Sequence, residues 1–162
     1  MDPWSKVGIW LAVGVPTMVF MEVWAAVLHG KVWHSLLYTL HESHHVPRTG
    51  RWEKNDLLSF THAPIAIALI LYGCLAAETV GREVAYGIGM GMTVFGIAYI
   101  VVHDGLVHKR LPVDWLARWR YFRLVRNAHD VHHRTGAVPY GLFFGPWAVK
   151  RYSRQRQARR QA

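Results

Sequence analysis

The run VGIWLAVGVPTMVFMEVWAAVL at residues 7–28 is apolar apart from one acid, Glu22. Residues 57–77 and 84–102 form two further apolar runs, and neither contains Asp, Glu, Lys or Arg. Each run has about the 20 residues that a helix needs to cross the hydrocarbon core of a bilayer. In a soluble protein, three helices that are apolar on every side would have to be buried all round, and a chain of 162 residues is too short to bury them. The sequence therefore predicts an all-α integral membrane helical bundle with a helical cap outside the bilayer, rather than a soluble helical core.

The composition supports this fold class and a single domain over residues 1–162. Hydrophobic residues make up 52% of the chain and charged residues 18%, whereas a soluble domain has about 25% charged residues. The single cysteine, Cys74, excludes a disulfide scaffold and is expected to be a small packing residue in the second run. Small residues allow close helix packing in membranes, which is expected at four glycines of the third run: Gly87, Gly89, Gly91 and Gly96.

Basic residues are distributed unequally between the segments outside the three runs. Residues 29–56 and 103–162 carry seventeen of the 19 Lys and Arg residues, and only Lys6 and Arg82 lie on the other side. By the positive-inside rule, these two segments and the C-terminus are expected in the cytoplasm. No transit peptide precedes the first run, which favours a bacterial inner membrane.

The end of the chain is basic, with six Lys and Arg residues and no acid in the tail at residues 150–162. Its only aromatic residue is Tyr152, so the composition favours contact with anionic lipid, and no nucleic-acid partner is expected. Residues 140–149 are apolar but too short for a regular span. A fourth membrane segment, either interfacial or re-entrant, is therefore an open alternative.

Ten of the eleven histidines fall into four clusters, in which the pattern HxxxxH followed by HxxHH occurs twice. All four clusters lie next to the ends of the predicted spans, on the expected cytoplasmic side. Neutral imidazole is the commonest metal ligand in proteins and suits Fe, Zn, Cu and Ni. Ten candidate ligands exceed the capacity of one ion, so two metal ions are expected. These candidates are His29, His34, His41, His44, His45, His103, His108, His129, His132 and His133.

The spacing within the clusters has a physical reason. Side chains three and four residues apart share one face of a helix, so the three histidines of each HxxHH set converge. His34 precedes His41 by two helical turns and is expected on the same stripe. The two histidines of each HxxxxH pair are five residues apart, which is about 140° around a regular helix. A break or bulge is therefore expected at Gly30 and Gly105, which lie inside these pairs.

The remaining ionisable residues near the clusters are of two kinds. His62 lies outside every cluster and is expected to be a packing or hydrogen-bonded residue at the start of the second span. Glu22 lies seven residues before His29 on the same helix face, and intramembrane carboxylates are costly and usually functional, so it is a candidate to hold an imidazole N–H. Three more candidates for this role, each equally compatible with a helix cap or a solvated charge, are Asp56, Asp104 and Asp130.

Two other classes of metal protein match part of the pattern. HESHH at residues 41–45 fits the HExxH motif, which supplies two ligands and a general base in zinc proteases. The second copy, HDVHH at residues 129–133, has no Glu at that place, and a zinc protease needs three protein ligands rather than ten. A histidine-rich metal carrier would line a path across the membrane, whereas these clusters lie on one side. Both classes are disfavoured.

A non-haem di-metal oxygenase accounts for the pattern better. A set of imidazoles can hold two irons beside the bilayer, where a hydrophobic substrate arrives. The chain has no dinucleotide-binding fingerprint, no haem-binding cysteine motif and no set of Fe–S cysteines. The electrons that an oxygenase needs are therefore expected from a separate donor.

Four stretches resemble the non-haem di-iron β-carotene 3-hydroxylases, the plant-type branch in particular. They are HGKVWH (29–34), HESHHVPRTGRWEKND (41–56), TVFGIAYIVVHDGLVHKRLPV (93–113) and AHDVHHRTGAVPYGLFFGP (128–146). The likeness extends over most of the chain, from Met21 to Pro146. It is more specific than the bare histidine pattern, which the wider fatty-acid and sterol hydroxylase superfamily shares.

The resemblance implies hydroxylation of carotenoid β-ionone rings at C3, from β-carotene to β-cryptoxanthin and zeaxanthin. It implies two iron ions held by the ten clustered histidines, O₂ as co-substrate, and a ferredoxin-type electron donor with its reductase. Residues 35–40 lack the aromatic-rich linker typical of the family. This difference affects the expected contacts with the substrate and not the expected metal site. Fatty-acid or sterol hydroxylation or desaturation is the alternative, and a homo-oligomer is left open.

A long apolar substrate would need a hydrophobic tunnel from the bilayer to the metals. Aromatic side chains near the predicted spans are candidates for its lining, although each is also compatible with ordinary packing. These candidates are Phe20, Trp24, Trp33, Phe95 and Tyr99.

Overall fold

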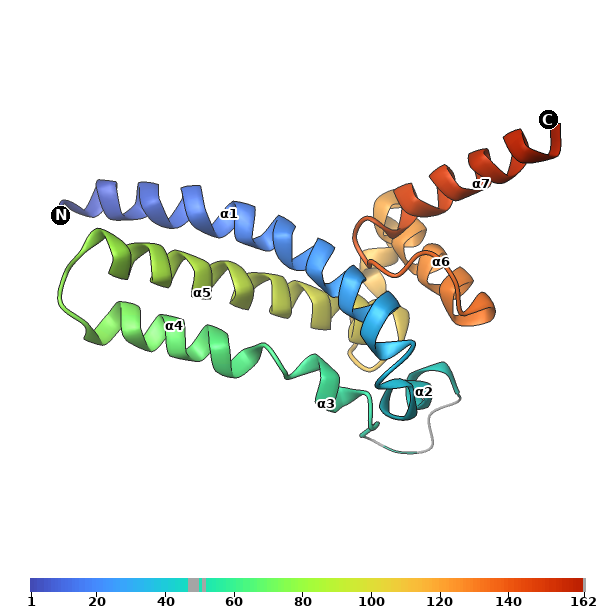
Figure 1. Ribbon diagram of the computed structural model, residues 1–162, viewed down its shortest axis with the longest axis horizontal. Coiled ribbons are helices and arrows are strands. Elements are labelled where there is room, and N and C mark those ends of the chain that lie inside the picture. Colours follow the sequence, from blue (N-terminus) through green and yellow to red (C-terminus); the bar gives the residue numbers. More distant parts are fainter. Residues whose placement is uncertain (47–49, 51, 162) are drawn as a thin grey trace. The chain divides into compact units, whose positions relative to one another are not determined.

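The computed structural model describes residues 1–46, 50 and 52–161, and all regular secondary structure among them is helical (Figure 1). Arg48 and Arg51, counted above on the basic side, lie outside the described residues. The prediction of an all-α fold is confirmed. The helices in chain order are α1 (Pro3–Leu28), the π-helix η1 (His29–Trp33), α2 (Tyr38–His45), α3 (Asp56–Ser59), α4 (Ala63–Leu75), α5 (Val80–Tyr99), the π-helix η2 (Ile100–Val107), the 3₁₀-helix η3 (Asp114–Arg118), α6 (Arg120–Thr135) and α7 (Gly145–Gln161).

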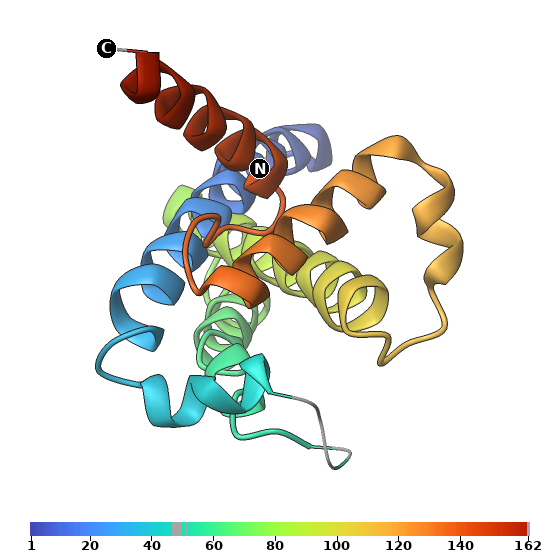
Figure 2. The same cartoon turned by 90° about the vertical axis from the view of Figure 1, so that its right-hand side faces the viewer.

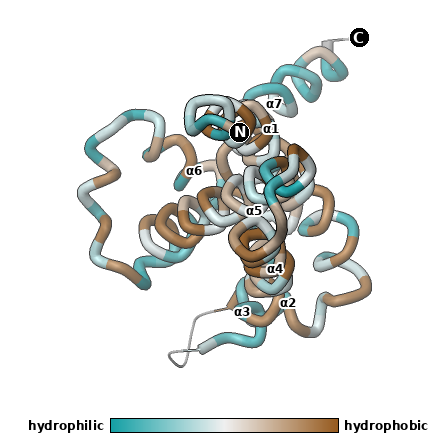
Figure 3. The backbone as a smooth tube through the Cα atoms, turned by 90° about the vertical axis from the view of Figure 1, so that its left-hand side faces the viewer, coloured by the Kyte–Doolittle hydropathy of each residue, from teal (hydrophilic) through white to brown (hydrophobic). Residues whose placement is uncertain are grey.

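Three helical segments are long and apolar enough to cross a membrane: Pro3–Trp33, Asp56–Leu75 and Val80–Val107. They contain the first and third apolar runs in full and the second run as far as Leu75, so the expectation of three helices able to cross a membrane is confirmed among the described residues. In Figure 3, α4 is hydrophobic along its length, whereas α7 is largely hydrophilic. The basic tail is therefore helical and distinct in character from the spans.

The chain divides into two compact units. The first unit comprises Met1–Met21 and Leu37–Ile97, and the second comprises Glu22–Leu36 and the chain from Ala98 onward. The single domain expected over residues 1–162 stays a prediction.

Glycines allow the helices of the first unit to approach closely. A Cβ atom at Gly91 of α5 would lie 2.5 Å from the carbonyl oxygen of Gly14 of α1, and one at Gly87 would lie 3.2 Å from the Cα of Trp10. On α5, a Cβ at Gly89 would lie 2.9 Å from the Ile70 side chain of α4. The packing predicted for these three α5 glycines is confirmed.

The same prediction is wrong for Gly96, where an added Cβ would meet no atom within 4 Å. Four glycines in one apolar run do not reveal which of them face a neighbouring helix, since that depends on the direction of each residue around the helix.

Near the start of α5, the first unit buries an acid. Glu83 is 1% exposed and accepts a hydrogen bond of 2.8 Å from the indole N–H of Trp10 in α1. Its other carboxylate oxygen pairs with Arg82, whose guanidinium also donates to the Ala76 carbonyl oxygen at 3.0 Å. These bonds connect α1, α5 and the turn that follows α4.

The second unit has its own core, made of Val102, Leu106, Leu116, Val125 and Leu142. These residues come from η2, η3, α6 and the segment that precedes α7. Figure 2 shows the chain leaving η2, passing through η3 and returning along α6. The last helix residue of α6 is followed by Gly136 at φ +64°, whose N–H donates to the His132 carbonyl oxygen at 2.7 Å, a left-handed cap that glycine favours.

Candidate metal centre

Each HxxxxH pair lies at a π-helical segment that follows a membrane-spanning α-helix. The N–H of His34 donates to the carbonyl oxygen of His29 at 3.1 Å, and the N–H of His108 donates to that of His103 at 3.0 Å. These i to i+5 bonds place residues five apart on one face of the helix. The ring centroids are consequently 5.1 Å apart in the first pair and 4.6 Å apart in the second. The predicted bulges in the HxxxxH pairs are confirmed.

The glycines inside the two pairs leave room for neighbouring side chains of the second unit. A Cβ at Gly30 would lie 2.8 Å from the Tyr140 ring, and a Cβ at Gly105 would lie 2.5 Å from the Val113 side chain. The glycines therefore serve packing at the π-helices as well as backbone freedom.

Helix α6 supplies the second HxxHH set and completes two clusters within the second unit. The first cluster is His29, His34 and His132, whose ligand nitrogens lie within 4.8 Å of one another. The second cluster is His103, His108 and His129, and the same limit holds for its nitrogens. The Nε2 atom of the neighbouring His133 lies 3.0 Å from the Nε2 atom of His129. All seven histidines of the second unit are thus gathered into two groups.

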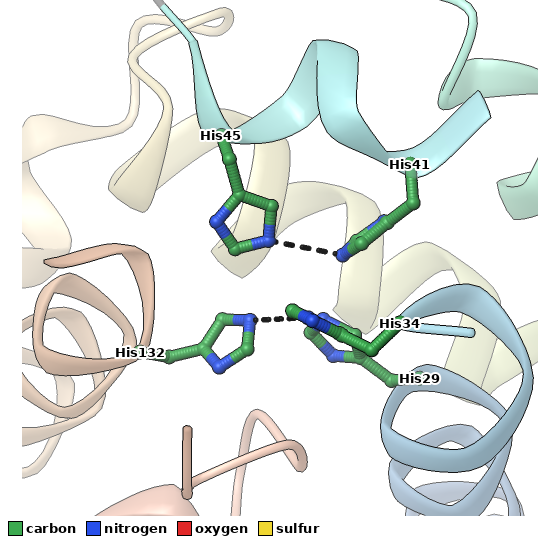
Figure 4. Close-up of side chains that lie close together, drawn as sticks. All are labelled: His29, His34, His41, His45 and His132. Carbon is green, nitrogen blue, oxygen red and sulfur yellow. Dashed lines mark hydrogen bonds between the residues drawn. The ribbon is translucent and has the colours of Figure 1, made fainter. Parts of the chain in front are cut away.

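The first unit contains the HxxHH set of α2. The Nε2 atoms of His41 and His45 lie 3.1 Å apart, and the Nδ1 of His44 lies 3.9 Å from Glu53 Oε2. Figure 4 shows the His41–His45 pair and the His34–His132 pair of the second unit, whose Nε2 atoms are 3.2 Å apart.

The prediction that His34 and His41 share one helical stripe is wrong. Residues 34–37 form a turn between η1 and α2, so the two histidines belong to different helices. The π-helix ends at Trp33 and α2 begins at Tyr38.

Oxygen atoms fix the proton position on several rings. The Nδ1–H of His29 donates to the Tyr140 carbonyl oxygen at 2.8 Å, and that of His132 donates to the Ala137 carbonyl oxygen at 2.7 Å. A carbonyl oxygen can only accept, so Nδ1 carries the proton in both rings. In the neutral ring the lone pair is then on Nε2, the form in which histidine binds a metal.

These features fit a metal ion. Lone pairs cannot hydrogen-bond to each other, so two such rings in one group of converging nitrogens are suited to a shared cation. In the second cluster, burial, together with the neighbouring imidazoles, lowers the pKa of His129 well below its usual range. The ring is therefore neutral at physiological pH and able to act as a ligand. A donor set made only of imidazole nitrogens suits Fe, Zn, Cu or Ni.

The four candidate acids lie in different environments. Asp104 accepts from the Nδ1–H of His103 at 2.7 Å. Glu22, which is 3% exposed, accepts from the main-chain N–H of Phe144 at 2.9 Å and, within the described residues, from no imidazole. Asp56 Oδ2 accepts from the Glu53 N–H at 3.0 Å, and Asp130 is half-buried.

Three partners of the histidines were not predicted from the sequence. The Nδ1 of His41 bonds to the side-chain oxygen of Asn55 at 2.7 Å, a residue that was not among the candidates. The other two are the carbonyl oxygens of Ala137 and Tyr140. Main-chain acceptors leave no trace in residue types, and α2 ends at His45, so helical spacing does not reach Asn55.

The candidates for a tunnel lining are dispersed. Tyr99 stacks on the His103 ring at 4.7 Å, and the Trp33 ring lies 5.6 Å from that of His29. Phe95 is buried in the first unit, while Phe20 and Trp24 are exposed on α1. A tunnel stays a prediction. His62 belongs to neither of the groups of converging ligand atoms and bonds to the neighbouring Thr61 hydroxyl at 3.1 Å.

Comparisons of the sequence with known proteins identify a family. The family model for fatty acid hydroxylase matches residues 14–149. The chain is 48% identical over 141 residues to β-carotene 3-hydroxylase 2, chloroplastic, of Arabidopsis thaliana, covering 86% of this chain and 46% of the relative. It is 40% identical over 149 residues to β-carotene hydroxylase of Pseudescherichia vulneris, covering 88% of this chain and 82% of the relative.

A third relative, β-carotene 3-hydroxylase, chloroplastic, of Gentiana lutea, is 47% identical over 146 residues, which are 89% of this chain and 45% of the relative. The chain thus spans about half the length of the plant relatives. No solved structure matches it. The matched residues include all four histidine clusters, the second and third spans and most of the first, and the chain belongs to the fatty acid hydroxylase family.

Proposed function

We propose that the protein is a membrane di-iron monooxygenase that hydroxylates C3 of carotenoid β-ionone rings, converting β-carotene to β-cryptoxanthin and zeaxanthin. The observation that carries this proposal is the set of ten histidines next to membrane-spanning helices, with ring protons held on Nδ1 by oxygen atoms. The names of the relatives indicate the substrate. Their sequence similarity covers every histidine pair and every HxxHH set.

The ten histidines would hold two iron ions. Bound iron would supply the oxidising power, drawn from O₂, that breaks an unactivated C–H bond, which no side chain can do by acid–base chemistry. The net reaction inserts one oxygen atom into the C–H bond and releases the other as water, consuming two electrons and two protons. We propose a ferredoxin-type donor with its reductase as the source of the electrons.

The protein's own residues would orient the ligands and the substrate. Asp104, Asn55 and the carbonyl oxygens of Ala137 and Tyr140 bond to Nδ1 of their rings and would leave Nε2 to bind the metals. The apolar spans would admit the substrate from the bilayer, and positioning would select C3 over neighbouring carbons.

Expression of the chain in cells that accumulate β-carotene tests the substrate. We expect β-cryptoxanthin and zeaxanthin in the pigment chromatogram. Unchanged β-carotene, with the protein present in membranes and iron supplied, would favour a fatty acid or sterol as substrate. Loss of a membrane peptide without oxygen uptake would instead revive a zinc protease built on HESHH at residues 41–45.

Removing the side-chain acceptor of His41 tests the imidazole hydrogen bonds. Asn55→Ala is expected to lower metal affinity about 10–100-fold, because the ring loses the partner that fixes its proton and direction. The measurement is the chelator concentration that removes half of the metal from purified protein. Asn55→Asp, which keeps an oxygen acceptor, is the matched control. Equal chelator resistance of Asn55→Ala and the native chain would contradict the role.

We propose that the histidine clusters and the C-terminus face the cytoplasm and, for a bacterial host, that the membrane is the inner membrane. The support is the unequal distribution of Lys and Arg. A reporter fused to the C-terminus should be active in the cytoplasm, and one inserted between α4 and α5 should be active on the opposite side. The reverse result would refute this topology.

A further inference from the structure

We propose that residues 137–144, the segment that connects α6 to α7, position two ligands of the first cluster, and that Glu22 of α1 holds this segment in place. The inference rests on the metal binding proposed above. Residues outside the ligand set thereby have a role, and the ligands of the two metal centres are oriented by different partners.

The main chain of the 137–144 segment contacts two ligands that come from different helices. Its first residue, Ala137, accepts the Nδ1–H of His132 from α6, and Tyr140 accepts the Nδ1–H of His29 from η1. One short stretch of backbone therefore fixes the rotation of both rings. A displacement of this stretch would turn both Nε2 lone pairs away from a common point.

The Tyr140 side chain makes the same connection through its ring. Its centroid lies 5.8 Å from that of His29, 5.4 Å from that of His34 and 5.4 Å from that of His132. The ring fits against η1 because residue 30 is glycine, where a Cβ atom would lie only 2.8 Å from the ring. All three histidines of the first cluster thus border one side chain of this segment.

Glu22 anchors the far end of the segment. Its Oε1 accepts the N–H of Phe144 at 2.9 Å, across 122 residues of sequence. A Cβ at Gly141 would lie 2.8 Å from this oxygen, so the glycine allows the carboxylate to approach the backbone. The other oxygen, Oε2, is buried and has no hydrogen-bond partner among the described residues. Burying a carboxylate in a membrane-spanning helix is costly, which indicates a function beyond helix packing.

In the second cluster, the acceptor for the His103 ring comes from η2 rather than from this segment. His103 donates to the side chain of Asp104, its own neighbour in η2, and the Nδ1 bonds of the 137–144 segment go to His29 and His132. Loss of the Glu22 anchor should therefore weaken the first centre and spare the second. A residue that only stabilised the fold would affect both centres alike.

The test is the metal content of purified chains loaded with ferrous iron in detergent without oxygen, measured together with their thermal unfolding. The native chain should hold about two irons and Glu22→Ala about one, because ligands that lose their orienting bonds bind metal about 10–100-fold more weakly. Glu22→Gln, which keeps an oxygen for the Phe144 N–H, should hold as much iron as the native chain. Gly141→Ala leaves the carboxylate in the chain but displaces it, and should lose the same iron as Glu22→Ala.

Glu83→Ala is the matched control. Glu83 is also a buried carboxylate, and it accepts a hydrogen bond from the indole N–H of Trp10. This variant should unfold at a lower temperature and retain both irons. The inference is overturned if Glu22→Ala keeps both irons, or if it and Gly141→Ala lose both. Should Glu22→Ala not fold, Gly141→Ala decides by itself. A native chain that binds no iron would instead refute the proposed function.

Discussion

Replacing His129 by alanine is expected to abolish hydroxylation, with product below the detection limit of pigment chromatography. His129 is 3% exposed and its ring contacts those of His103, His108 and His133, so its loss opens the middle of the second cluster. A metal site that loses a ligand to a small apolar side chain has no nearby replacement in a buried position. The measurement is pigment conversion in β-carotene-accumulating cells, normalised to the amount of protein in membranes.

The same loss is expected for His41, His45 and His133, which belong to the two HxxHH sets. His62→Ala is the matched control, because this histidine lies outside the groups of converging ligand atoms and should leave conversion unchanged. Conversion by His129→Ala at the native rate would contradict the metal-ligand assignment. So would loss of conversion in His62→Ala at a normal protein level.

The second large effect is expected from packing rather than chemistry. Gly91→Ala should destabilise the first unit by about 1–3 kcal/mol, because its Cβ would lie 2.5 Å from the Gly14 carbonyl oxygen and force α1 and α5 apart. Backbone atoms cannot rotate out of the way as a flexible side chain can. The measurement is the thermal unfolding temperature of the purified chain in detergent.

Gly96→Ala is the control for helix propensity. It lies on the same helix and has no atom within 4 Å of the added Cβ. Alanine favours a helix by about 1 kcal/mol over glycine, so this variant should be as stable as the native chain or more stable. Equal unfolding temperatures for Gly91→Ala and Gly96→Ala would show that α1 and α5 do not pack through these glycines.

The spans and the bulges could be predicted because both follow from short-range patterns. Runs of apolar residues specify membrane helices whatever their neighbours are. The spacing of His29 and His34 conflicts with a regular helix, and the glycine between them permits the π-helix that resolves the conflict. In both cases the residue types within a few positions contain the information.

The partners of the ligands could not be predicted, because they depend on tertiary structure. Glu22 lies at a spacing that favours contact with His29, yet its carboxylate bonds to the backbone of Phe144. The continuous stripe expected from His34 to His41 is interrupted by a turn at residues 34–37. Helical spacing predicts neighbours only while the helix lasts, and no Gly or Pro at residues 34–37 marks the end of η1.

Hydroxylation of β-carotene under ¹⁸O₂ is the measurement that tests the central claim most directly. Purified, iron-loaded protein would be supplied with β-carotene in detergent, a reduced ferredoxin and its reductase, and the products analysed by mass spectrometry. The account predicts β-cryptoxanthin and zeaxanthin in which every new hydroxyl carries ¹⁸O, and no product when iron is removed by a chelator. Product that carries oxygen from water, or product that forms equally well without iron, would contradict a di-iron monooxygenase.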